Sequence, residues 1–591
     1  EIYTRSRHDA LPILEKKSRR SRPELWGGIE CTINRIGNKY RDQLAYAHHF
    51  ERPSDLSKIA ELGISKMRYP VLWESHQFKS RDEKINWERI TEKLQHIVEL
   101  GIEPIAGLVH HGSGPEFTSL SDKKFGEKLS EYAYKVAQQF PHIKYYTPVN
   151  EPLTTARFSG LYGFWYPHYK DPRHFCNMFV NQLKAIVLSM KEIRKVVPGA
   201  MLVQTEDLTR IQCSRGLKYQ ATFENHRRWL TYDFLCGAFT PTHPLWNYFI
   251  SMGISKKELS FFLDNPCVPD IAGFNYYVTS ERFLDKNIKN WPGLNHDGNG
   301  VDRYVDVEAV RAVKPFGLEY LLKEAWNRYK IPLALTEVHL NCTREEQLRW
   351  FKEAWDIAQK VNNEGIPVYG VTAWSLLGAF DWNSLLTLEN HRYEPGVFDI
   401  TNNELRPTAI SSLLQSFSHK NKYDHPLLSQ QGWWHYSYKN QKRDNDQHGP
   451  NPLIIVGGNG TLGNAFKKIC ERRSIPYIAV SRPEYDITKI NSFRNLFEKY
   501  KPWAVINATG YVKVDEAEIE RDICYSLNVS AAVSLASLCN QMGIQLMSFS
   551  SDLVFNGDKE LPYFENDKVA PLNYYGFTKA EAEEKIRGHF P

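Results

Sequence analysis

Short apolar stretches alternate with amphipathic ones over the first four hundred residues of the chain. The apolar stretches are β-rich and have the length of buried strands, whereas the others repeat apolar residues every three or four positions, as helices do. This pattern predicts strands at 25–30, 64–69, 102–110, 145–149, 201–206, 271–277, 333–338 and 368–376. It predicts helices at 54–62, 86–100, 123–140, 172–197, 223–236, 315–329, 344–363 and 407–417.

Eight strands that alternate with helices favour a parallel sheet closed into a (β/α)8 TIM barrel, which we assign to residues 25–417. Ser54 is expected to cap the helix that follows it. The long connection Ser280 to Asp306 is expected to be a loop that walls a pocket at the barrel mouth.

A second alternating pattern opens at Leu453, with strands predicted at 453–456, 477–480, 504–508 and 545–549. It predicts a Rossmann-type, doubly wound α/β domain over residues 453–591. Residues 418–452 are rich in Lys, Asn, Gln, Asp and His, and we interpret them as a linker. Its aromatic residues, which we expect to pack on a neighbouring domain, are Trp433, Trp434, Tyr436 and Tyr438.

Composition is that of a globular protein, with 42% hydrophobic and 24% charged residues and a net charge of +5. Residues 1–24 form a basic segment that we interpret as a solvated tail, so neither nucleic-acid nor membrane binding is expected. The nine cysteines lack a CxxC or metal-like spacing, which indicates reduced thiols and no metal site. Without a signal peptide or a run of about eighteen apolar residues, we expect a cytoplasmic, soluble protein.

Two predicted strands end in a glutamate. Tyr145 to Val149 runs into Asn150-Glu151-Pro152, where the proline stops the strand, and Leu333 to Val338 carries Glu337 at its tip. In a parallel barrel these carboxyl ends meet at one mouth, where active sites are built. Hydrolysis of a glycosidic bond needs one carboxylic acid to protonate the leaving oxygen and a second carboxylate as nucleophile or base. We therefore predict that Glu151 and Glu337 face each other, about 5–5.5 Å apart.

These motifs resemble glycoside hydrolase family 1, the retaining β-glycosidases. Tyr146-Thr-Pro-Val-Asn-Glu-Pro is similar to the Thr-Phe-Asn-Glu-Pro signature of the family, and Thr336-Glu337 is similar to its nucleophile motif. The resemblance implies that Glu151 is the acid/base and Glu337 the nucleophile. It also implies that the nucleophile is held by an arginine and a tyrosine, here Arg68 and Tyr277. The further substrate-binding residues implied are Asn34, His110, Asn150, Asn275, Trp374, Asp381 and Trp382.

Departures from the family pattern fall at sugar-recognition positions. Asn34 stands where the family has glutamine, His110-His111 replaces a His-Trp pair, and Asp381 replaces the glutamate that binds the distal hydroxyls. Buried sites that hydrogen-bond hydroxyls reject mismatched sugars steeply. We therefore expect a deoxy, amino or nucleotide-linked sugar rather than a plain glucoside.

In the second domain, the strand at 453–456 runs into Gly457-Gly-Asn-Gly460-Thr-Leu-Gly463 and then a helix. Such glycines let the backbone approach a pyrophosphate, which the helix N-terminus attracts. Tyr575 and Lys579 lie four residues apart, so on a helix they share one face, where the lysine can lower the pKa of the phenol.

These features resemble the extended short-chain dehydrogenase/reductases of the dTDP-4-dehydrorhamnose reductase type. Ser550-Ser-Asp-Leu-Val-Phe and Pro571-Leu-Asn-Tyr-Tyr-Gly-Phe-Thr-Lys are similar to motifs of that family. The resemblance implies a catalytic trio of Ser551, Tyr575 and Lys579. It implies NAD(P)H, with a binding site made of Gly457, Gly460, Gly463, Asp486, Ala508 and Tyr511. Members of the family continue well beyond the position of Pro591, so we expect this domain to be incomplete at its C-terminus.

The sequence thus predicts a bifunctional carbohydrate enzyme, in which a cofactor-free β-glycosidase barrel is fused to an NAD(P)H-dependent reductase of 4-keto sugar nucleotides. The alternative is a glycosyl-transferring or non-catalytic sugar-binding barrel, with a Rossmann domain that senses dinucleotide or drives oligomerisation. The expected partners are a sugar or glycoside and a sugar nucleotide, and association into a homo-oligomer is left open.

Overall fold

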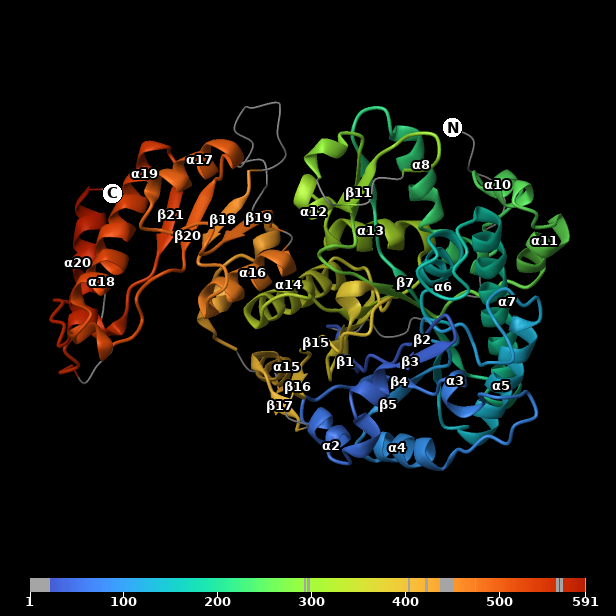
Figure 1. Ribbon diagram of the computed structural model, residues 1–591. Coiled ribbons are helices and arrows are strands. Elements are labelled where there is room, and N and C mark those ends of the chain that lie inside the picture. The colour runs from blue at the N-terminus through green and yellow to red at the C-terminus, as the bar shows by residue number, and fades with distance from the viewer. Residues whose placement is uncertain are drawn as a thin grey trace. The chain divides into compact units, whose positions relative to one another are not determined.

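The computed structural model describes residues 22–291, 294, 298–401, 404–419, 423–435, 451–473, 475–559, 563 and 567–589. The chain divides into two compact units, one built around a closed barrel and the other around a four-stranded sheet (Figure 1). Each unit has its own hydrophobic core, so each is described by itself.

The first unit is an eight-stranded parallel barrel, which confirms the predicted TIM barrel. Its strands are β1 (Glu24–Gly28), β4 (Lys66–Pro70), β5 (Glu103–Gly107), β6 (Tyr145–Thr147), β7 (Met201–Asp207), β9 (Ile271–Asn275), β12 (Leu333–Val338) and β13 (Val368–Ala373). They close in the order β1-β13-β12-β9-β7-β6-β5-β4. Large and small side chains fill the interior, among them Trp26, Ile105 and Val203, so the barrel is a packed core with its chemistry at one end.

Helices surround the barrel: α2 (Asp55–Ala60), α4 (Glu88–Glu99), α5 (Phe125–Gln139), α7 (Pro172–Val196), α8 (Lys218–Arg227), α9 (Leu230–Leu235), α13 (Leu318–Tyr329), α14 (Arg344–Asn363) and α15 (Ala409–His419). Helix α7 starts where its sequence indicates, because the Asp171 side chain accepts from Arg173 N and Pro172 occupies the first turn. The expected cap at Ser54 is wrong, since this side chain makes no capping hydrogen bond to α2.

The connection from Ser280 to Asp306 contains regular structure that its composition did not indicate. Strand β10 (Arg282–Asp285) pairs with β8 (Ile211–Cys213) and with β11 (Val305–Glu308) in a three-stranded sheet outside the barrel. A second addition follows β1, where β2 (Ile33–Ile36) and β3 (Lys39–Asp42) form a hairpin. This hairpin fixes the position of Asn34.

The described part of the region 418–452 packs on the barrel unit. The Trp434 ring lies 5.7 Å from that of Trp350 on α14, and its Nε1 donates to Glu353. The Arg311 guanidinium lies 4.7 Å from the Trp433 ring centroid. The other two aromatic residues of the predicted patch, Tyr436 and Tyr438, lie outside the described residues.

The second unit has the parallel sheet of a doubly wound fold, as predicted. Its strands are β18 (Leu453–Val456), β19 (Tyr477–Val480), β20 (Ala504–Asn507) and β21 (Gln545–Ser548), in the order β19-β18-β20-β21. Alternate residues of β18 face opposite sides. Ile454 and Val456 pack towards α17 (Ile490–Tyr500) and α19 (Ala531–Gln541), whereas Leu453 and Ile455 pack with Cys470 of α16 (Thr461–Arg473).

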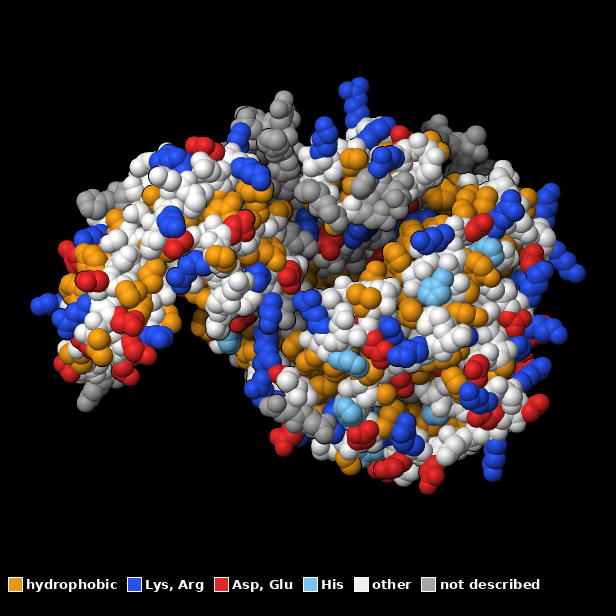
Figure 2. Space-filling view, in the orientation of Figure 1, with side chains coloured by type: hydrophobic (Ala, Val, Ile, Leu, Met, Phe, Trp, Pro, Cys, Tyr) orange, Lys and Arg blue, Asp and Glu red, His pale blue; other side chains and the backbone are white. Residues whose placement is uncertain are grey.

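Charges of both signs are interspersed on the face shown in Figure 2. Within the described residues, one helical stretch, Arg521–Gln541, is long and apolar enough to span a membrane by length and composition, and half of its most apolar window is buried. The sequence reading had found no such segment. Ala531, Leu535 and Leu538 of this stretch belong to the core of the second unit, where a buried helix passes the same test.

Glu74, in α3 (Trp73–His76), gives a prediction for stability. Its Oε1 accepts from Gly114 N at 3.0 Å, and burial raises its pKa to about 7. The neutral form is therefore favoured by folding, so its contribution to stability is complete below the unfolded pKa of about 4.3 and is lost as pH rises to about 7. The free energy of unfolding of Glu74→Gln, relative to that of wild type, should rise by about 1.4 kcal/mol per pH unit between these limits and should not rise further above them. Calorimetric unfolding at a series of pH values tests this, and a difference that does not change with pH would contradict it.

Candidate active sites

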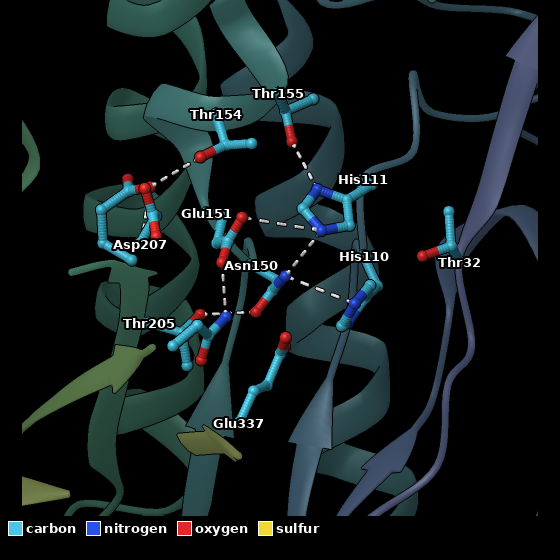
Figure 3. Close-up of polar contacts among 12 residues, drawn as sticks. Thr32, His110, His111, Asn150, Glu151, Thr154, Thr155, Thr205, Asp207 and Glu337 are labelled. Atoms are coloured by element: carbon cyan, nitrogen blue, oxygen red, sulfur yellow. Dashed lines mark hydrogen bonds and ion pairs between the residues drawn. The ribbon is translucent and has the colours of Figure 1, made fainter. Parts of the chain in front are cut away.

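Glu151 and Glu337 both lie at the carboxyl ends of the barrel strands. Glu151 follows β6 in a left-handed conformation (φ 44°) and precedes α6 (Pro152–Ala156), so the strand ends abruptly and turns its carboxylate inward. Glu337 lies in β12. Figure 3 shows both carboxylates turned toward the space around the Asn150 side chain.

Glu337 has a cation and a phenol as partners. Arg68 Nη1 donates to its Oε1 at 2.8 Å, and the Tyr277 hydroxyl donates to its Oε2 at 2.5 Å. Arg68 is itself fixed, because its two terminal nitrogens also donate to the Thr336 carbonyl at 2.7 Å and to Asn150 Oδ1 at 2.6 Å. The carboxylate therefore has a counter-ion and a fixed orientation, as a nucleophile requires.

Glu151 lies in a different environment. Its nearest polar contacts are Asn275 Nδ2, which donates to Oε1 at 2.6 Å, and His111 Nε2, which lies 3.8 Å from Oε2. Burial raises the pKa of Glu151 well above its usual value, and the negative charges of Glu337 and Glu206 add to the rise. A carboxyl group that stays protonated near neutral pH can act as a general acid.

Asn150 connects the two glutamates to a pair of histidines. Its Oδ1 accepts from Arg68 and from Thr205 Oγ1 (2.7 Å), so its Nδ2 faces His110 Nε2 and His111 Nε2, each at 3.3 Å. Burial lowers the pKa of His111 to about 3 and that of His110 well below its usual value. Both rings are therefore neutral near neutral pH and serve as hydrogen-bond partners.

Two further acids beside this pocket were not predicted. Glu206 accepts from Leu153 N at 3.0 Å and from Thr231 Oγ1 at 2.7 Å, which ties the Glu151 turn to its neighbours. Asp207, at the end of β7, accepts from Ser280 Oγ at 2.9 Å. Burial raises the pKa of Glu206 to about 7 and that of Asp207 to about 6. Their position at a strand end was a visible signal, as it was for Glu151.

Some of the expected sugar-binding residues lie beside the two glutamates and the two histidines, whereas the carboxylate of Asp381 is engaged elsewhere. Trp374 stacks on His110, with ring centroids 5.4 Å apart, and Trp382 lies 5.7 Å from His111, so both rings lie beside the histidine pair. Asn275 accepts from Thr336 Oγ1 and donates to Glu151. Asp381 instead accepts from the backbone N–H groups of Asn390, His391 and Arg392, at 3.1, 3.0 and 2.9 Å. Its carboxylate holds that turn.

Glu30 is a buried acid that is not among the predicted site residues. It follows β1, is 4% exposed, and accepts at Oε1 from Thr32 N at 2.9 Å. Burial raises its pKa to about 7, hydrogen bonding from Thr32 opposes the rise, and the Glu337 charge adds to it. The rule that selected Glu151 and Glu337, a carboxylate at a strand's carboxyl end, selects Glu30 as well.

Gly457, Gly458 and Gly460 of the second unit lie in the turn after β18, and Gly463 lies in the first turn of α16. Gly457 has φ 88°, and a Cβ on Gly463 would lie 2.2 Å from Gly457 O, so side chains are excluded at both positions. Gly460 has room, since a Cβ there would meet Gly457 O at 3.5 Å. The turn precedes α16, whose N-terminal N–H groups favour an anion. The residues present therefore fit a dinucleotide pyrophosphate.

The other residues expected to line the nucleotide are placed around this turn or engaged locally. Ala508 N donates to Val456 O, which places Ala508 beside the glycine turn. Asp486 accepts from Thr488 N at 3.0 Å and from Thr488 Oγ1 at 2.9 Å, so its carboxylate is engaged within its own loop. The Tyr511 hydroxyl donates to Glu520 at 2.6 Å.

Ser551, Tyr575 and Lys579 come together next to η10 (Asp552–Val554) and in α20 (Tyr574–His589). Burial raises the pKa of Tyr575, and a hydrogen bond with Ser551 opposes the rise. Lys579 Nζ lies 5.9 Å from the Tyr575 ring centroid and donates to Phe549 O at 3.1 Å. The expected lowering of the phenol pKa by Lys579 is therefore not what this arrangement produces.

A barrel with two buried glutamates in contrasting environments at its mouth is the architecture of a glycosidase. The description "Glycosyl hydrolase family 1" matches residues 23–393, and the chain belongs to this family. A family 1 β-glucosidase from Thermotoga maritima aligns with 68% of this chain and 98% of its own, with a TM-score of 0.55 and 16% identity. A second structure of a family 1 glycoside hydrolase from that organism, complexed with a cyclophellitol analogue, covers 69% of this chain and all of its own, with a TM-score of 0.55 and 16% identity. These solved structures support the fold.

The second unit matches a different family. The description "RmlD substrate binding domain" matches residues 451–591. A dTDP-4-dehydrorhamnose reductase from Aggregatibacter actinomycetemcomitans is 35% identical over 135 residues, which are 23% of this chain and 46% of the relative. A dTDP-4-keto-6-deoxy-D-glucose reductase from Streptomyces niveus is 29% identical over 138 residues, 23% of this chain and 48% of the relative. The chain thus spans about half the length of the curated relatives it matches.

Proposed function

We propose that the chain is a bifunctional carbohydrate enzyme whose barrel is a retaining β-glycosidase. The observation that carries the proposal is the contrast between the two glutamates. Glu337 is paired with the Arg68 guanidinium, whereas Glu151 is buried among carboxylates and favours its protonated form. A nucleophile and a general acid need these two opposite environments.

In the proposed reaction, Glu337 attacks the anomeric carbon while the Glu151 carboxyl protonates the departing glycosidic oxygen. The anomeric C–O bond to the aglycone breaks and a glycosyl ester with Glu337 forms. Glu151, now a carboxylate, takes a proton from water, which attacks the anomeric carbon and releases Glu337. The Tyr277 hydroxyl, which donates to Glu337 Oε2, holds the attacking carboxylate in place.

Trapping of the ester tests this proposal. A panel of 2-deoxy-2-fluoro glycosides with activated leaving groups, incubated with the full chain, is expected to label the peptide that contains Glu337 because the fluorine slows hydrolysis of the ester. Mass spectrometry should find one glycosyl group on that peptide and none in Glu337→Gln. A glycoside that is turned over without such a label, or a label on another acid, would contradict the assignment.

For the second unit we propose an NAD(P)H-dependent reductase of 4-keto sugar nucleotides, on the strength of its reductase relatives and its glycine turn. Bound NAD(P)H would supply the hydride. Tyr575, with Ser551 beside it, would donate a proton to the carbonyl oxygen, and Lys579 would support the phenol. A hollow of about 680 Å³ along β21, lined also by α19 and α20, includes Thr509, Ser550 and Lys579 in its lining. We place the protein in the cytoplasm, where sugar nucleotides are available.

Binding of NADH or NADPH gives a direct test of this proposal. Gly460→Ala should preserve the fold, since the new methyl group meets only ordinary contacts, but it places that group where the pyrophosphate approaches the turn. We expect dinucleotide affinity to fall by about 10-fold or more, on the scale of 1.4 kcal/mol per factor of ten. The control is Gly588→Ala in α20, where a Cβ meets no atom within 4 Å. Equal affinity in both variants would place the dinucleotide elsewhere.

A further inference from the structure

The family pattern assigns the recognition of distal sugar hydroxyls to an acid at position 381, and here that acid is occupied. Both carboxylate oxygens of Asp381 accept backbone N–H groups of residues 390–392, and the residue is 3% exposed. Turning this side chain away from the turn would break three hydrogen bonds to a carboxylate, each of which contributes about 1.5–3 kcal/mol. The hydroxyl-binding acid must therefore come from another element.

Three buried polar side chains, Glu30, Thr32 and Asn34, come from the segment after β1. They alternate in sequence with Cys31 and Ile33, which belong to the hydrophobic core, and Asn34 lies in strand β2. Figure 3 shows Thr32 across from His110. All three are less than 5% exposed.

Both polar atoms of the Asn34 side chain have no partner within the described structure. Asn34 Oδ1 and Asn34 Nδ2 are fully buried and make no hydrogen bond there. Buried polar groups are normally paired, so unpaired ones at the wall of a pocket indicate a ligand that pairs with them. A sugar, with several hydroxyls that both donate and accept, has the required chemistry.

Glu30 lies close to the reacting groups. Glu30 N donates to Ser375 Oγ at 2.9 Å. The neighbouring Trp374 ring stacks on His110 and lies 4.7 Å from the Arg68 guanidinium, which pairs with Glu337. Glu30 therefore lies beside the residues that surround the proposed nucleophile.

We propose that Glu30 is a specificity-determining residue, whose carboxyl group hydrogen-bonds a glycone hydroxyl together with Asn34. Glu30 would thus bind the hydroxyl that the family pattern assigns to the acid at position 381. The proposal rests on the proposed glycosidase function. It also accounts for Asn34, which is shorter than the glutamine of the family. Glu30, four residues earlier, would supply the additional hydrogen-bonding group.

The test combines a variant with deoxy substrates. On the best aryl glycoside of a panel, measured above pH 7 so that Glu30 is ionised, Glu30→Gln is expected to lower kcat/KM about 10- to 100-fold, the effect of a hydrogen bond to a charged group. On the monodeoxy analogue that lacks the hydroxyl bound by Glu30, the same variant should lose less than about 3-fold, because the partner is already missing. Asp381→Asn is the matched control and should lower kcat/KM by the same factor on every analogue.

Two outcomes would overturn the assignment: an unchanged kcat/KM in Glu30→Gln, or an equal loss on every deoxy analogue, which marks a structural role. If wild type hydrolyses no glycoside, the glycosidase proposal fails by itself. The comparison is then made by calorimetric binding of the free monosaccharides and their deoxy analogues. Selective weakening in Glu30→Gln supports the assignment, and equal binding, or no binding to wild type, overturns it.

Discussion

Glu337→Gln is expected to abolish glycoside turnover, lowering kcat on the order of 10⁴- to 10⁶-fold, as does loss of an essential nucleophile. The amide has the shape of the carboxylate but cannot attack the anomeric carbon. It also loses the charge that pairs with Arg68, although the Tyr277 hydroxyl can still donate to the amide oxygen. Initial rates on aryl glycosides, with thermal unfolding to verify the fold, measure the loss.

A second variant, Glu337→Ala, tests whether this residue is the nucleophile. Azide should enter the space left by the side chain and react at the anomeric carbon from the face that Glu337 used, giving a glycosyl azide of inverted configuration. The binding-only alternative predicts the same residual rate in wild type and Glu337→Gln. A wild type that transfers glycosyl groups to an added alcohol in preference to water would instead favour the transferase alternative.

Glu151→Gln is expected to lower kcat by about 10²- to 10⁴-fold on glycosides with poor leaving groups, the range of general acid catalysis. A dinitrophenyl glycoside departs without a proton, so its first step should be almost unaffected and slow hydrolysis of the ester should give a burst of phenolate. Stopped-flow measurement of that burst separates the acid from the nucleophile, since Glu337→Gln should show none. The same fold-loss on both kinds of leaving group would remove Glu151 from the acid role.

The pH profile gives a second signature of Glu151. The active form requires this carboxyl to be protonated, so kcat/KM should fall as pH rises through its raised pKa. In Glu151→Gln that fall should disappear from the profile, because the amide does not titrate. A basic limb that is unchanged in the variant would have to be assigned to another group, and Glu30, whose pKa burial raises to about 7, is the first to test.

The sequence was sufficient for the architecture because the relevant signals are local. Strands and helices follow from hydrophobic periodicity, and eight alternations leave few closed arrangements. Glu151, Glu337 and the turn at Gly457 could be predicted for the same reason. A proline ends the strand beside Glu151, the glycines are required by the backbone of the turn, and each glutamate lies at the end of a predicted strand. What failed at this level was a matter of local detail, such as the absent cap at Ser54 and the strands hidden within 280–306.

The tertiary structure decided which side chains are free to meet a substrate. Asp381 and Asp486 have the right chemistry in sequence, but the carboxylate of each accepts hydrogen bonds from nearby backbone groups. Glu30 also accepts from Thr32 N, and its burial became visible only in the structure. The same holds for protonation, since the neutrality of His111 and the acidity of Glu151 depend on burial and on charges brought from other strands. Local pattern fixes where the chain turns, but hydrogen-bond partners and desolvation come from residues distant in sequence, and these set the chemistry of the site.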